Sequence, residues 1–79
     1  MFQYWIEDRG SKGFACIRDN EKGETHGIAT KQETLGFAYE CAWNDFMNQF
    51  SRIMPDGRRH LIPVDQRPAF RCEQRSATR

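Results

Sequence analysis

The feature that most constrains this chain is an apolar stripe in its middle third. Apolar residues recur there at steps of three and four, the spacing that places side chains on one face of a helix. The stripe consists of Leu35, Ala38, Ala42, Phe46, Phe50 and Ile53. Thr30 and Glu33 precede it with the spacing of a capping box. The sequence therefore predicts a helix from Thr30 to about Met54, of roughly 24 residues and 36 Å.

The segments around this helix predict short strands. Before the helix, alternating or apolar runs bounded by turn residues occupy residues 2–7, 14–18 and 24–29. After it, Pro55-Asp-Gly57 predicts the end of the helix and a turn, and Arg58–Val64 predicts a short last strand. Pro63 has no amide hydrogen to donate, so this last strand is expected at a sheet edge.

The order of these elements predicts an α+β fold of the type β-β-β-α-β. Its parts are a three-stranded antiparallel meander, one long helix packed on the sheet, and the short last strand. A chain of 79 residues has room for one domain. We expect this domain to occupy residues 1–65 and an Arg-rich C-terminal tail to occupy residues 66–79.

Charge is distributed unevenly along the chain. Residues 1–50 carry five basic and eight acidic groups, a net charge of −3, whereas residues 51–79 carry seven arginines and three acidic groups, a net charge of +4. Arg67, Arg71, Arg75 and Arg79 are spaced four apart, so they would align on one side of a helix. Twelve or so residues are too few to be helical alone, so we expect a tail that is loose when free and orders on an acidic partner.

No constellation of residues predicts catalysis, a metal site or a cofactor. Cys16, Cys41 and Cys72 are odd in number and form no CxxC pair, so they are interpreted as reduced thiols acting as small hydrophobes. The histidines His26 and His60 belong to no ligand-spaced array. No run is long and apolar enough for a membrane span, and no signal peptide is recognisable, so we expect a cytoplasmic protein that does not act at a membrane.

Several motifs between Tyr4 and Pro63 occur in an order that resembles a known family. A glycine and an aromatic open the second strand at Gly13-Phe14, and a capping Thr with an acidic residue precedes a Leu-x-x-Ala helix start. An acidic-Gly turn, Asp56-Gly57, and an Ile-Pro strand, Ile62-Pro63, follow the helix. In this order the motifs resemble the N-terminal fold of HicB-type antitoxins. A looser likeness links the chain to the arm-binding domains of phage integrases.

Together these features favour a small non-catalytic regulator that binds a protein partner. The resemblance implies an antitoxin-like protein or a phage-type inhibitor of a nuclease or host defence complex. The alternative is a nucleic-acid-binding module that uses the sheet and the arginine tail. An edge strand could also pair with a second copy to give a homodimer. The candidate partner-binding residues are Trp5, Trp43, Met47, Arg58, Arg59, Arg67, Arg71, Arg75 and Arg79.

Overall fold

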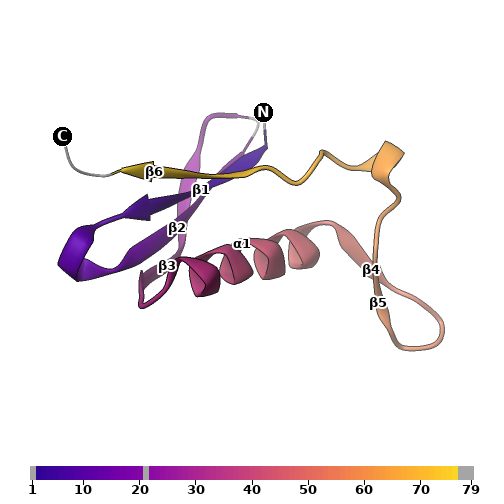
Figure 1. Ribbon diagram of the computed structural model, residues 1–79. Helices are drawn as coiled ribbons and strands as arrows, with labels where there is room; N and C mark the ends of the chain where they lie inside the picture. The colour runs from indigo at the N-terminus through magenta and orange to yellow at the C-terminus, as the bar shows by residue number, and fades with distance from the viewer. Residues whose placement is uncertain (1, 21, 77–79) are drawn as a thin grey trace.

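The computed structural model describes residues 2–20 and 22–76 and has an α+β fold, as the sequence predicts. Its main sheet is mixed and has the strand order β3-β2-β1-β6 (Figure 1). The four strands are β1 (Gln3–Asp8), β2 (Phe14–Asp19), β3 (Thr25–Gln32) and β6 (Cys72–Ser76). The first three pair antiparallel in sequence order, and a 3-10 turn, η1 (Gly10–Lys12), joins β1 to β2. β6 pairs parallel with β1.

The core lies between one face of this sheet and the helix α1 (Leu35–Gln49) (Figure 1). Phe2, Tyr4 and Ile6 alternate along the N-terminal segment and are buried, as their period of two predicts. The helix buries the centre of the predicted stripe, and its residues Ala38, Ala42 and Phe46 have no exposed surface. Small alanines let the helix backbone approach the sheet closely, and the Phe46 ring fills the space beyond them.

The helix begins later than the capping box at Thr30 and Glu33 predicts. Thr30 belongs to β3, and the N-cap is Thr34, whose hydroxyl accepts a hydrogen bond from the Phe37 amide at 3.1 Å. Both threonines can cap a helix, but the backbone of Thr30 is held in the ladder that β3 forms with β2. The predicted capping box is therefore wrong, and the helix has 15 residues.

The helix also ends earlier than predicted. Phe50 is its C-cap, and the chain continues as a hairpin of β4 (Ser51–Ile53) and β5 (Arg59–Leu61), which pair only with each other in the described structure. Pro-Asp-Gly is the reason: Pro55 and Asp56 form the centre of a turn in which the Gly57 amide donates to the Met54 carbonyl at 2.8 Å. The predicted strand Arg58–Val64 is thus an arm beside the helix end and not a fifth strand of the main sheet.

The C-terminal segment is neither a loose tail nor a helix over its described residues. After the 3-10 turn η2 (Val64–Gln66), the chain returns along the sheet and forms β6 beside β1 (Figure 1). Phe70 reaches the core on the way, with its ring 5.1 Å from the ring of Phe46 and 5.8 Å from that of Tyr4. A strand forms because β1 would otherwise leave the hydrogen-bonding groups of its outer edge unpaired.

Candidate partner-binding surfaces

The predicted partner-binding residues do not form one surface. The structure separates them into the β4–β5 hairpin, the sheet face opposite the helix, the outer side of the helix, and the segment between η2 and β6, which holds Arg67 and Arg71. Arg79 lies outside the described residues. The hairpin, residues 51–61, is called the arm below. It holds Arg58 and Arg59 of the predicted set.

The arm extends the molecule beyond the end of α1 and away from the sheet (Figure 1), in agreement with overall dimensions of 47 × 25 × 16 Å. Its register pairs Arg52 with His60 and Ile53 with Arg59. Because cross-strand partners share a face, Ile53 and Arg59 lie on one face and Arg52 and His60 on the other. On the first face, the Arg59 guanidinium donates to the Ser51 hydroxyl at 3.0 Å. This face therefore places the apolar side chain of Ile53 next to the oriented guanidinium of Arg59.

Three of the five exposed large apolar side chains in the described structure lie on or next to the arm, and the other two, Phe37 and Trp43, lie on α1. Ile53 is 67% exposed, Met54 39% and Val64 71%. The arm carries three arginines against the single acid Asp56, a net charge of +2 with His60 neutral. Apolar side chains that face solvent contribute little to the stability of the fold, whereas apolar residues and arginines are enriched in interface cores. Ile53 and Met54 were not predicted as binding residues because their apolar spacing places them in the helix, although Pro-Asp-Gly is also a hairpin signal.

The sheet face opposite the helix holds Trp5 and Arg75. The Arg75 guanidinium lies over the Trp5 ring at 4.1 Å from its centroid, a cation–π contact. Arg75 also donates to the Glu73 carboxylate at 2.6 Å, and the Trp5 indole N–H donates to Glu7 at 3.4 Å. Hydrogen bonds from Arg9 are the main reason why the pKa of Glu7 is lowered. Trp5 is thus half-buried beneath a charged network and does not present a bare ring.

Trp43 and Arg67, two further members of the predicted set, stabilise the fold. Trp43 is 40% exposed, but its ring stacks on Phe46 at 5.9 Å and meets Phe70 edge-on at 5.1 Å. The Arg67 guanidinium donates to the Ile62 carbonyl at 2.8 Å and lies 5.4 Å from the centroid of the Phe46 ring. These contacts anchor the segment that leads from the arm to β6.

The side chains of two further members of the set, Met47 and Arg71, make no such contacts in the described structure. Met47 is half-buried on α1, and Arg71 is exposed just before β6. The Arg71 carbonyl accepts a hydrogen bond from the Tyr4 amide at 2.8 Å, so its backbone holds β6 against β1.

A polar network between sheet and helix was not predicted. The Tyr4 hydroxyl donates to Asp45 at 2.5 Å, and the Arg18 guanidinium donates to both Asp45 carboxylate oxygens at 2.9 and 2.8 Å. Burial and, next, the hydrogen bond to Asp45 raise the pKa of Tyr4. Every partner is satisfied and the aspartate is held by an arginine, which suits a structural clamp rather than an acid–base catalyst.

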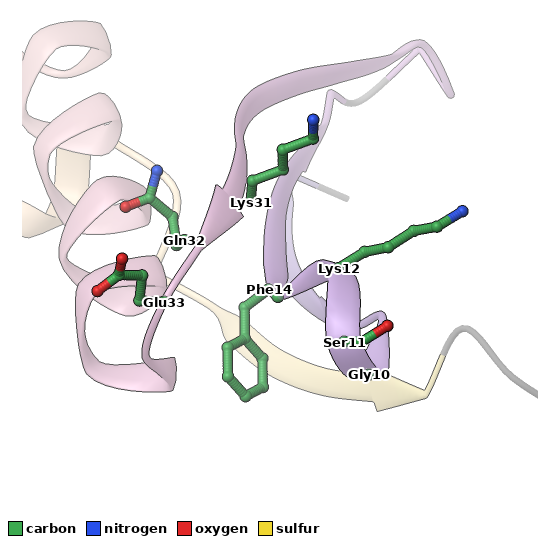
Figure 2. Close-up of a pocket in the computed structure, with 8 residues that line it drawn as sticks. Gly10, Ser11, Lys12, Phe14, Lys31, Gln32 and Glu33 are labelled. Carbon is green, nitrogen blue, oxygen red and sulfur yellow. The ribbon is translucent and has the colours of Figure 1, made fainter.

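A shallow cleft of about 550 Å³ lies where η1 meets the end of β3 (Figure 2). Lys12 and Lys31 extend outward from it, and Glu33 stands on its opposite side. Lys31 has φ 60°, and a Cβ placed on Gly13 would lie 2.7 Å from the Gln32 carbonyl oxygen. The backbone is therefore tightly constrained, but opposite charges and open geometry give the cleft no catalytic set.

The described residues contain no group of three or more His, Cys, Asp and Glu side chains that could hold a metal ion, and no helix among them could span a membrane. The three cysteines are free thiols, and burial raises the pKa of Cys16 to about 12 and that of Cys72 to about 11. Such thiols are poor nucleophiles at neutral pH. Comparison with protein-family models, curated proteins and solved structures finds no match to this chain.

Proposed function

We propose that the protein is a small non-catalytic regulator that binds a protein partner through the arm. The observation that supports this most directly is the exposure of Ile53 beside Arg59 on one face of a projecting hairpin. A two-stranded hairpin is marginally stable alone, so its exposed apolar face is a surface that a partner would cover. The partner has a complementary surface, with an apolar recess bordered by carboxylates.

The resemblance to HicB-type antitoxins extends this proposal to the kind of partner. We infer a nuclease or a host defence complex, which the arm would inhibit by occupying an acidic surface. The carboxylates that hold catalytic metal ions in many nucleases are one such surface. The free thiols suit a reducing cytoplasm, where a regulator of this kind would act.

The experiment begins with the full chain as bait in an extract of its host, and continues with titration calorimetry of each purified partner. The test variant is Ile53→Asp, and the matched control is Arg52→Glu, which changes the opposite face of the same hairpin. We expect Ile53→Asp to weaken the partner's binding at least tenfold, about 1.4 kcal/mol, and the control to have a smaller effect. A partner that binds both variants as tightly as the wild type would refute the arm as the site.

Inhibition is measured on the same purified partner. Stoichiometric addition of the wild-type protein should suppress its nuclease activity, and the Ile53→Asp variant should require at least about tenfold more protein. A partner that is bound through the arm but keeps full activity would refute the inhibitor function while leaving the binding surface in place.

One observation favours nucleic acid as the alternative ligand. The arm is a two-stranded antiparallel ribbon that carries Arg52, Arg58 and Arg59, and the major groove of DNA admits such a ribbon. Three phosphate contacts would reduce affinity roughly 40-fold between 50 and 200 mM salt. Gel shifts with duplex and single-stranded probes at these two salt concentrations separate the alternatives. Here Arg52→Glu would weaken binding as much as Arg59→Glu, unlike in the protein complex.

A further inference from the structure

The outer edge of β6 is the end of the described sheet, because β6 has only β1 as a neighbour. In the parallel ladder, the Tyr4 amide donates to the Arg71 carbonyl at 2.8 Å. Backbone groups of a strand point alternately to either side, so Glu73 and Arg75 also direct theirs toward β1. The amide and carbonyl of Gln74 therefore point outward, away from the sheet.

The charged side chains of β6 are arranged symmetrically about the centre of the strand. Glu73 and Arg75 lie on the sheet face that carries Trp5, and they flank Gln74 symmetrically. The strand thus has an acid on one side of its centre and a base on the other. A segment with this pattern is complementary in charge to a copy of itself that runs in the opposite direction.

We propose that a second copy of this chain pairs with β6 in the antiparallel direction, with Gln74 opposite Gln74 of the second copy. The two Gln74 residues would exchange a pair of backbone hydrogen bonds across the two-fold axis. Each Glu73 would then face Arg75 of the second copy in the flanking pairs, where side chains approach most closely. The two sheets would become one continuous sheet of eight strands.

Symmetry and charge together select this register. A two-fold axis between antiparallel strands must pass through one residue and its copy, because hydrogen-bonded and non-hydrogen-bonded pairs alternate. An axis at Glu73 would set Glu73 against Glu73 and Arg71 against Arg75, and an axis at Arg75 would set two arginines against each other. Both place like charges opposite one another, which is destabilising. An axis at Cys72 would set Arg71 against Glu73, but Cys72 is the first residue of β6, so this axis pairs the segment before the strand and not the strand itself. The axis at Gln74 lies at the centre of β6 and sets opposite charges against each other on both sides of it.

The existing contacts on this face favour the same arrangement. Glu7 lies beside Arg75 in the register of β1 with β6. Across the interface, Glu73 of the second copy would extend this row to acid, base, acid. Strands of five residues bury little surface, so the dimer belongs to the weak class below about 1,200 Å², with dissociation in the micromolar range or above. This inference concerns β6 alone and does not depend on the proposed function of the arm.

Sedimentation equilibrium of the full chain over a range up to roughly 500 µM tests the proposal. The wild type should show reversible dimerisation. Glu73→Arg and Arg75→Glu should each dimerise at least about tenfold more weakly, because each places like charges opposite one another twice. The double variant with both substitutions should recover dimerisation, and an equimolar mixture of the two single variants should form a heterodimer. Far-UV circular dichroism checks that each variant is folded.

A further variant addresses the backbone. Gln74→Pro removes the outward amide without removing a hydrogen bond to β1, and it should dimerise at least about tenfold more weakly while remaining folded. A wild-type chain that stays monomeric over this range would overturn the proposal. So would single charge variants that associate like the wild type, or a mixture of them that fails to associate.

Discussion

Replacement of Phe70 by alanine tests whether the C-terminal segment belongs to the core. The Phe70 ring contacts three others, with centroid distances of 5.1 Å to Trp43, 5.1 Å to Phe46 and 5.8 Å to Tyr4. Two of these contacts are edge-on, the geometry in which aromatic pairs attract beyond simple area burial. The residue itself is only half-buried, so part of its surface already faces water.

The magnitude follows from these contacts. Truncation of a fully buried Phe to Ala costs about 3–5 kcal/mol, and the partial exposure of Phe70 reduces this to about 2–3 kcal/mol. A domain of this length has a free energy of unfolding of roughly 4–12 kcal/mol, so the loss is a large fraction of the total. With a urea dependence of about 1 kcal/mol per molar, the unfolding midpoint should fall by roughly 2–3 M.

Urea titration followed by tryptophan fluorescence and circular dichroism measures this shift. Val64→Ala is the matched control, because Val64 is apolar, close in sequence and 71% exposed, and it should change stability by less than about 0.5 kcal/mol. Phe70→Leu should fall between the two. If Phe70→Ala is as stable as the control, the segment after the arm does not close the core and the assignment of Phe70 to it is wrong.

Four other perturbations are expected to have measurable effects. Deletion of residues 67–79 removes β6 together with the Phe70 ring, so circular dichroism of the truncated chain should show an unfolded protein rather than a stable core without a tail. Gly13→Ala should lower the free energy of unfolding by about 2–4 kcal/mol in urea titrations, because its φ is 85° and a Cβ would lie 2.7 Å from a backbone oxygen of β3. Gly10→Ala, which has φ 62° but open space around it, should cost only about 1 kcal/mol. The free energy of unfolding should also fall as pH rises above 9. Burial raises the pKa of Cys16 from 9.0 to about 12, so between these values only the unfolded state ionises this thiol freely. Urea midpoints measured between pH 8 and 11 should show the decline, and the decline should be smaller in Cys16→Ala.

Local patterns predicted the centre of the fold well. Apolar residues at a period of two correctly identified Phe2, Tyr4 and Ile6 as buried, and apolar residues at a period near four did so for Ala38 and Phe46. These predictions succeed because each depends only on which side chains share a face of one element. The ends of the elements were harder to predict. Thr30 and Thr34 are equally suitable helix caps, and the hydrogen-bonded ladder between β2 and β3 decides between them.

The return of the chain as β6 could not be predicted from local patterns. Cys-Glu-Gln-Arg-Ser contains no β-branched or aromatic residue, so its strand propensity is low. Its pairing with β1 also joins residues almost seventy positions apart, as in Tyr4 with Cys72. The hydrogen-bonding edge of β1 and the anchoring of Phe70 supply what propensity lacks. A tertiary contact thus overrides the local signal.

The same reasoning explains why the sequence indicated the arginines as candidate binding residues but did not indicate what each of them does. A spacing of four places residues on one face of a helix and equally on one face of a strand, so spacing alone cannot choose between them. Neighbours decide instead: Arg67 donates to a backbone carbonyl, Arg75 lies on Trp5, and Arg59 projects on the arm. A partner that recruits the Arg67 guanidinium must first break its hydrogen bond to the Ile62 carbonyl. The arginines of the arm therefore have the greater binding free energy to contribute.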